Sequence, residues 1–476
     1  MIRATGWHLV GVVSLVALSA FASVACAQGL EGAAGTDAPS RPKIKFNRWQ
    51  EDWSALADPR LRTGFLDQLK YIPLSASNPA SYMSFGLTVR ERFESNNTPF
   101  FGTGTNQGDS YLLDRVQGHV DIRPNAQWQI FVELEDVRAP WKTVITPVDE
   151  NPLDLRLAFI AYVDSFWGGT LKVRVGRQQM AFDLQRFVSI RDGPNVQQAY
   201  DAVWVDWEQD LWRFIGFWSQ PVQYRHEHPF DDFSDTNFQY GGFRVERQNV
   251  GPGDLSAYYS RFHLNKVSYL FASGDERRDI FDVRYAGARD GFDWDLEAMG
   301  QSGHVGNKNV RAWAVGSRTG YTLARVGWTP RLGLQVDAAS GDEHPKDNTL
   351  GTFNPLFPNG YYFTLSGYTG YVNLIHLKPS VTVKPFGPVS FMTAVGLQWR
   401  QTTADAVYVQ PNSAVRGTAG RPGLWTGIYV QTRTEWAITP NLAGAIETVN
   451  FQVGDAIRRA GGSNSTYVGI QLTYAW

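Results

Sequence analysis

Apolar and polar residues alternate with a period of two along most of this chain. In LKVRVG, which begins at Leu171, the leucine and both valines share one face, whereas Lys172 and Arg174 fall on the other. This period is typical of a β-strand with one apolar and one polar surface. Similar segments recur as MSFGLTVRERF, WQIFVELE, LRLAFIAYV, GIYVQTRTEW and TYVGIQLTYAW. We count roughly eighteen of them and predict an all-β, antiparallel fold.

The connections between these segments alternate in length. Tight turns are expected at 124–126, 166–168, 208–210, 289–291, 385–387 and 439–441. Long polar loops are expected near 95–110, 139–153, 180–199, 223–237, 263–278, 341–371, 402–422 and 453–465. Outer-membrane barrels alternate in this way, with short turns facing the periplasm and long loops facing outward. We therefore predict a transmembrane up-and-down β-barrel of about 18 strands over residues 81–476.

The first 80 residues differ from the rest. Residues 1–27 are typical of a secretory signal peptide, with Arg3, an apolar core and the cleavage pattern Ala25-Cys26-Ala27. Residues 28–45 are small and polar, so we expect a flexible lead-in. Residues 46–80 mix tryptophans with charges and predict short helical turns. This segment is expected to form an N-terminal arm or a plug on the periplasmic side.

Composition supports a β-protein in a membrane. Aromatic residues make up 14% of the 476 residues, and glycine occurs 46 times, as expected for a barrel with aromatic girdles. No run of about 18 apolar residues follows residue 30, so transmembrane helices are not expected. Cys26, the only cysteine, would leave with the signal peptide. Without Arg3, 43 basic residues face 46 acidic ones, a net charge of −3 that argues against a nucleic-acid partner.

The polar face of each strand is expected to point into the lumen, because roughly eighteen strands enclose an aqueous channel. The predicted pore-lining residues are Arg90, Arg92, Arg115, Arg156, Lys172, Arg174, Lys378, Arg400 and Arg433. The first six lie on neighbouring strands whose acids are few, mainly Glu133 and Glu135. A one-sided ring of cations passes anions, and the guanidinium group suits carboxylates. For single positions, the alternative is an ordinary lumen charge paired with an acid. Arg177 falls on the apolar side of the alternation and is placed at the rim.

Other chemistry has little support in the sequence. The motifs G-x-S-x-G and H-E-x-x-H do not occur. His226, Glu227 and His228 are adjacent on a loop and project in different directions, which disfavours a metal site. The stretch from Gly351 to Pro358 either gates the outer mouth, contacts sugar rings or is a plain packed loop. We therefore expect no enzyme activity, no metal and no cofactor.

Several blocks of the chain resemble a known family. LRLAFIAYVD followed by LKVRVGRQQM is similar to the fourth and fifth strands of the bacterial alginate-export family of outer-membrane barrels. RFVSIRDGPNVQQAYD and SGDEHPKDNTLGTFNPLFPNGYYF resemble loop blocks of its homologues. The resemblance implies an eighteen-stranded barrel with an arginine-rich constriction through which a uronate polymer leaves the cell. It also implies that Arg156 and Arg174 are pore arginines.

We therefore predict a passive channel for an anionic polysaccharide or oligosaccharide in the outer membrane of a Gram-negative bacterium. Its expected contacts are outer-membrane lipid, lipopolysaccharide and periplasmic secretion partners, and it is expected to be a monomer. One alternative is an uptake porin for small anionic or aromatic solutes. Another, from a different class, is an outer-membrane hydrolase.

Overall fold

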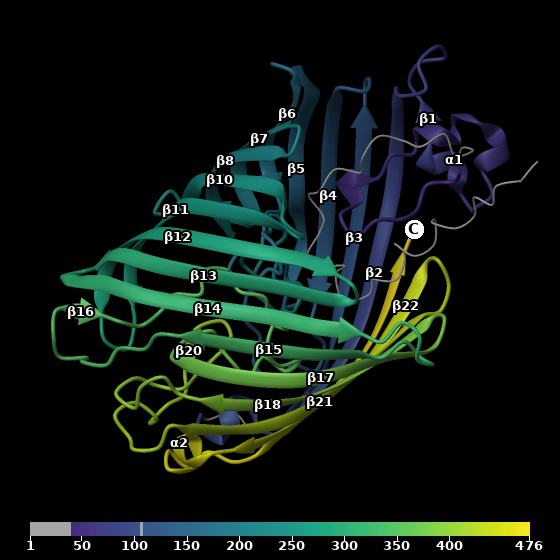
Figure 1. Cartoon of the computed structure of the whole chain (residues 1–476). Helices are drawn as coiled ribbons and strands as arrows, with labels where there is room; N and C mark the ends of the chain where they lie inside the picture. The colour runs from purple at the N-terminus through teal and green to yellow at the C-terminus, as the bar shows by residue number, and fades with distance from the viewer. Residues whose placement is uncertain (1–39, 105–107) are drawn as a thin grey trace, which may run out of the picture.

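Eighteen long antiparallel strands form a closed barrel in the computed structural model, which describes residues 40–104 and 108–476. The strands are β2 (Tyr82–Asn96), β3 (Asp109–Arg123), β4 (Trp128–Arg138), β5 (Asn151–Phe166), β6 (Gly169–Gln178), β7 (Tyr200–Gln209), β8 (Trp212–Gln223), β10 (Phe238–Val250), β11 (Gly253–Ser268), β12 (Ser273–Arg289), β13 (Phe292–Val305), β14 (Lys308–Thr322), β15 (Arg331–Ala339), β17 (Leu374–Phe386), β18 (Val389–Trp399), β21 (Trp425–Ala437), β22 (Leu442–Val453) and β23 (Ser465–Ala475). Each pairs with its neighbour along the chain, and β23 closes the barrel on β2, with Thr88 opposite Ala475. The predicted strand number and topology are confirmed. Figure 1 shows consecutive strands side by side around the barrel.

The alternation in the sequence separates an apolar outside from a mixed inside. In β4, Ile130 and Val132 are 36% and 37% exposed, whereas the alternating residues Phe131 and Glu133 are almost fully buried. Successive side chains of a strand point to opposite faces, so the exposed set is the outer surface of the barrel. An apolar outer surface of this kind suits lipid. No helix among residues 40–104 and 108–476 is long and apolar enough to cross a membrane.

Large aromatic residues gather at the end of the barrel that carries the short turns. Exposed rings at this end are Trp128, Phe166, Trp167, Trp212, Phe292, Phe386, Trp436 and Tyr474. An aromatic ring has an apolar body, and the indole and phenol groups add a polar edge, so such residues are enriched where hydrocarbon meets water. This girdle marks the periplasmic boundary of the membrane.

The predicted alternation of connection lengths holds with exceptions. Residues 167–168, 210–211, 251–252, 290–291 and 387–388 form short turns at the periplasmic end, where 323–330 is longer. At the outer end, 306–307 is a two-residue turn. The prediction of a long loop at 263–278 is wrong, because only residues 269–272 separate β11 from β12. The charged residues of this segment belong to β12. Glu276 and Arg278 point inward and form an ion pair at 2.5 Å, whereas Arg277 between them is exposed.

The N-terminal segment packs into the periplasmic end of the barrel through short turns: η1 (Arg48–Gln50), η2 (Ser54–Ala57), η3 (Pro59–Leu61), α1 (Asp67–Lys70) and β1 (Ile72–Pro73). The ring of Trp49 packs edge-on against Phe131 and Phe159, both on the inner face of the barrel. Arg48 donates to Thr88 Oγ1 at 2.9 Å and to the carbonyl oxygen of Trp476 at 2.8 Å. Figure 1 shows α1 and β1 beside the C-terminus, at the end opposite the long loops.

Two long loops, residues 179–199 and 340–373, fold into the outer part of the barrel. Most of their buried aromatic residues form one hydrophobic cluster with inward-facing residues of β7 to β15. The loops meet each other where Ser189 donates its N–H to Phe357 at 3.0 Å and Asn359 donates to Gln185 at 3.2 Å. Phe357 also packs against Tyr200 and Tyr240. The stretch from Gly351 to Pro358 is thus a packed part of the interior.

Candidate functional site

Eight of the nine predicted pore-lining cations lie on barrel strands with their side chains on the inner face. They come from β2 (Arg90, Arg92), β3 (Arg115), β5 (Arg156), β6 (Lys172, Arg174), β17 (Lys378) and β21 (Arg433). Their positions follow from alternation: in β2, for example, Arg90 and Arg92 are buried while Glu91 between them is exposed. The structure brings the first six together on adjacent strands, as β2 to β6 are consecutive neighbours.

Arg90 and Arg115 bind the 179–199 loop. Arg115 Nη1 lies 2.8 Å from Asp192 Oδ1, and Arg90 Nη1 lies 3.8 Å from the same oxygen. Arg90 also donates to Asn195 Oδ1 at 3.0 Å, and Arg115 to the carbonyl oxygen of Asn195 at 2.8 Å. Both arginines are less than 5% exposed. The loop therefore covers these two cations in this conformation.

Arg92 and Arg433 share Glu447 on β22. Arg92 Nη2 lies 2.6 Å from one carboxylate oxygen and Arg433 Nη1 lies 2.5 Å from the other. Glu94 adds a second acid to Arg92 at 2.6 Å. The guanidinium of Arg92 also stacks on the ring of Tyr361, at 5.2 Å from its centroid. Tyr361 belongs to the 340–373 loop, so this second loop covers the part of the barrel wall that carries Arg92.

Arg156 and Lys172 are likewise paired with acids. Arg156 pairs with Glu133 and, through Nε at 3.4 Å, with Glu135. Lys172 Nζ lies 3.0 Å from Glu208 Oε1. The interior charges are therefore built largely as ion-pair networks, the alternative that the sequence left open for single positions.

Arg174 is different, because it has no ion pair with a carboxylate among the described residues. Its Nε donates to Gln178 Oε1 at 2.5 Å. Its guanidinium lies 5.5 Å from the ring of Trp49, 5.3 Å from Phe159 and 5.9 Å from Trp204. Aromatic faces attract a cation without cancelling its charge. Arg174 therefore places a positive charge without a directly paired carboxylate at the inner face of β6.

Lys378 and Arg400 serve as loop anchors. Lys378 donates to the carbonyl oxygens of Phe363 and Tyr362 at 2.8 and 3.3 Å. Arg400 follows the end of β18 and donates to backbone carbonyls of its own loop, including Thr418 at 2.7 Å. Alternation cannot be extended past the end of a strand, so assigning Arg400 to the pore wall was wrong.

The 179–199 loop carries acidic and basic residues whose partners on the barrel wall cannot be identified from the sequence. Arg186 Nη1 lies 2.6 Å from Asp295 and 2.5 Å from Glu297, both on β13. Asp183 binds Arg244 on β10 through both oxygens, at 2.6 and 2.7 Å. Together with Asp192, these residues tie the loop to opposite arcs of the barrel wall. The density of charge in this stretch was the available sequence signal.

The surroundings set the protonation of the acids in this loop. Burial raises the pKa of Asp183, but the nearby guanidinium groups of Arg244 and Arg284 outweigh it and lower the pKa to about 2. Burial also opposes ionisation of Asp192, and Arg115 and Arg90 overcome this effect and lower its pKa. Both carboxylates are therefore ionised near neutral pH and hold their arginines as charged pairs.

Three carboxylates converge at the outer rim, from Asp154, Asp231 and Asp232. Asp232 accepts hydrogen bonds from the N–H of Arg225 and from Asn151 Nδ2, at 3.0 and 2.8 Å. Burial, chiefly, raises the pKa of Asp232 to about 7. Partial protonation near neutral pH reduces repulsion within the group, so these contacts account for the cluster.

The barrel is similar in fold to several solved structures of Occ/Opd proteins from Pseudomonas aeruginosa. OccK9 (OpdG) superposes with a TM-score of 0.54 at 10% identity, covering 83% of this chain and 98% of that one. For OccK11 (OpdR) the TM-score is 0.52 at 10% identity, with 83% and 95% covered. OccK2 (OpdF), crystallised with glucuronate, gives a TM-score of 0.50 at 10% identity, with 83% and 96% covered. At such low identity the likeness shows the fold.

Sequence comparison identifies the family. Among curated proteins, no relative matches the chain. The family model described as alginate export, however, matches residues 81–471, which are nearly the whole barrel. The predicted resemblance is confirmed. This chain belongs to the alginate export family and forms a channel in the outer membrane of a Gram-negative bacterium.

Proposed function

We propose that this channel passes an anionic, uronate-rich polysaccharide of the alginate type along a wall lined by Arg90, Arg92, Arg115, Arg156 and Arg174. Membership of the alginate export family supports the class of substrate. Arginine on the inner faces of β2, β3, β5 and β6 supports it chemically, because a guanidinium group binds a carboxylate with two parallel hydrogen bonds.

The observation that carries the proposal is the free charge of Arg174. An arginine paired with glutamate is nearly neutral to a passing ion, whereas a cation without a carboxylate partner attracts mobile anions. Arg90 and Arg115 lie under the 179–199 loop, so a polymer reaches them only after this loop moves. Arg174 does not bind Asp192, and its contact with this loop is one hydrogen bond from Nη2 to the carbonyl oxygen of Gln179 at 3.4 Å, so the loop leaves its charge without a paired acid.

The test is ion selectivity in planar bilayers under a potassium chloride gradient. We expect the wild-type reversal potential to show anion preference and the Arg174→Gln variant to lose much of it. Arg289→Gln is the matched control, since Arg289 is 71% exposed in the last residue of β12, at the periplasmic end. Cation selectivity of the wild type would contradict the proposal. Equal selectivity of wild type and Arg174→Gln would remove Arg174 from the conducting path.

A second candidate function is uptake of small anionic solutes. The two folded-in loops favour it, because they fill the outer part of the barrel with packed aromatic residues. OccK2, which shares the fold, was crystallised with a single uronate sugar. Liposome swelling with glucuronate and with oligouronates of increasing length separates the two candidates. A small-solute porin would admit only the monosaccharide, whereas a polymer channel would admit chains.

We also propose that the protein acts as a monomer without enzymatic activity and that residues 46–80 plug its periplasmic mouth. The contacts of Trp49 and Arg48 with the inner wall support the plug. Light scattering of the purified protein in detergent tests the monomer. Incubation with alginate and with phospholipid tests for hydrolysis. Products that the wild type releases, and that a variant lacking a single acid or histidine does not, would favour a hydrolase.

A further inference from the structure

A cavity of about 290 Å³ lies among the long loops at the outer end of the barrel. Its walls come from five connections, namely residues 97–104, 139–150, 179–199, 340–373 and 400–424, with Asn96 at the end of β2. This volume is at the lower end of small-molecule sites, which span about 300–1,000 Å³. It suits one sugar ring with its substituents better than a long segment of polymer.

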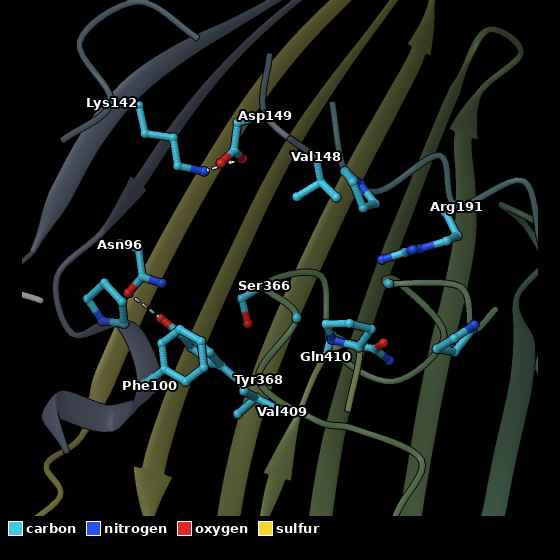
Figure 2. A pocket seen from close by; sticks show the side chains of 16 residues that line it. Asn96, Phe100, Lys142, Val148, Asp149, Arg191, Ser366, Tyr368, Val409 and Gln410 are labelled. Atoms are coloured by element: carbon cyan, nitrogen blue, oxygen red, sulfur yellow. Dashed lines mark hydrogen bonds and ion pairs between the residues drawn. The ribbon is translucent and has the colours of Figure 1, made fainter. Parts of the chain in front are cut away.

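The charge of the cavity comes from Arg191. The lining holds two cations and one anion, Arg191, Lys142 and Asp149, for a net charge of +1. Lys142 Nζ and Asp149 Oδ1 are 2.5 Å apart and neutralise each other. The guanidinium of Arg191 has no hydrogen bond or ion pair within the part of the chain that the structure describes. Figure 2 shows it extending from its loop toward the open space between the other lining residues.

The backbone explains why Arg191 stays free. Its neighbour Asp192, the nearest acid in the sequence, turns the other way and is held by Arg115 at 2.8 Å. Arg191 itself has a φ of +54°, a left-handed conformation that non-glycine residues rarely adopt. Its N–H donates to Ser189 Oγ at 3.0 Å, which helps to fix this conformation. Such unfavourable backbone geometry is concentrated at binding sites, where surrounding contacts maintain it.

The remaining lining fits a sugar. Phe100 is 40% exposed, and Pro99, Pro194, Pro358 and Pro411 add apolar surface against which the C–H face of a ring can pack. The hydroxyl of Ser366 is buried and has no hydrogen-bond partner among the described residues. In Figure 2, Ser366 lies between Tyr368 and Gln410, whose side chains add further polar groups. Apolar walls with a few convergent polar groups are typical of a binding site for a small polar ligand.

We propose that this cavity is an outer binding site for one uronate unit, with Arg191 binding its carboxylate and Phe100 and the prolines packing against its ring. The choice of a uronate rests on the proposed function, since the geometry by itself specifies a carboxylate on a compact ring. The site lies on the outer side of the 179–199 loop residues that bind Arg90 and Arg115. A polymer or solute would therefore contact it at the extracellular mouth.

Equilibrium binding to the purified full-length protein in detergent tests the site, with isothermal titration calorimetry of sodium glucuronate and of neutral glucose. We expect the wild type to bind glucuronate and not glucose. Arg191→Asn should weaken glucuronate binding by at least about tenfold, the effect of losing one charge-assisted pair. Asparagine tolerates the left-handed conformation, so this variant should fold. Arg191→Lys, which keeps the charge and loses the bidentate geometry, should bind with intermediate affinity.

The matched control is Arg416→Asn, which removes an exposed arginine from the 400–424 loop outside the cavity lining. It should bind glucuronate like the wild type. Equal affinity of wild type and Arg191→Asn, or equal binding of glucose and glucuronate, would overturn the site. So would absence of glucuronate binding to the wild type. These results are independent of bilayer selectivity, so the site can fail while the channel proposal stands, and the reverse.

Discussion

The 179–199 loop should be released from the barrel wall when Asp183 loses its charge. The carboxylate is 4% exposed and bridges Arg244 on β10 and Arg284 on β12, the latter at 2.9 Å. Asp183→Asn keeps the shape of the side chain and removes the charge that both guanidinium groups face. We expect the loop to leave its docked position more often, because the variant keeps the packing but loses the ion pairs.

The lowered pKa of Asp183 gives the magnitude of the stabilisation that the variant loses. Its fall from 3.8 to about 2, at about 1.4 kcal/mol per pKa unit, is worth about 2 kcal/mol to the docked loop. This corresponds to roughly a thirty-fold change in the docking equilibrium. Because the pKa is depressed in the docked state, the stabilisation is fully present above about pH 4. It is lost as the pH falls from about 4 toward 2.

Single-channel recordings can measure the docking equilibrium as the fraction of time spent in a higher-conductance state. At pH 7 we expect Asp183→Asn to occupy that state about thirty-fold more than the wild type. Wild type should approach the variant as the pH falls below 4, so the difference between them should shrink. Asp279→Asn is the control, since Asp279 forms an exposed pair with Arg261 that contributes little. If Asp183→Asn matches the wild type at pH 7, or if their difference does not depend on pH, the loop is not held by this charge.

Three further predictions concern the arm and the barrel wall. Trp49→Ala should weaken docking of the N-terminal arm by about 3–5 kcal/mol, because the ring contacts with Phe131 and Phe159 are lost. Proteolysis should then cleave the arm faster while the melting temperature of the barrel stays unchanged. An arm that is protected as well as in the wild type would contradict the plug. Gly86→Ala should lower thermal stability by about 1–3 kcal/mol, because a Cβ there overlaps the ring of His119 and crowds Arg48, and heat-modifiability on gels measures this. Val132→Arg should destabilise the barrel by about 2–4 kcal/mol, because Val132 is on the lipid face near the middle of its strand. Urea titration of the protein in vesicles measures this loss of stability. A change near zero would place Val132 outside the hydrocarbon layer.

Part of the candidate site could be predicted from the sequence, because inward placement is a local property. Arg90, Arg115 and Arg174 lie on the predicted face, since the period of two is imposed by strand geometry and needs no knowledge of distant residues. The same reasoning failed at Arg400, where the strand had ended and the side chain turned to loop carbonyls. It also misread residues 263–268 and 273–278 as loop, because a strand with a polar inner face carries as many charges as a loop.

The sequence by itself determined the barrel, the approximate number of its strands and the ends at which most of its long and short connections lie. Only the tertiary structure decided which charges are free. Asp192 is 77 residues from Arg115, yet it pairs with that arginine, while the guanidinium of Arg191 beside it has no partner among the described residues. The reason is that an ion pair depends on how two loops fold into a closed lumen. No periodicity along the chain encodes that distance, so Arg174 and Arg191, cations without a directly paired carboxylate in the described part of the chain, can be identified only from the folded structure.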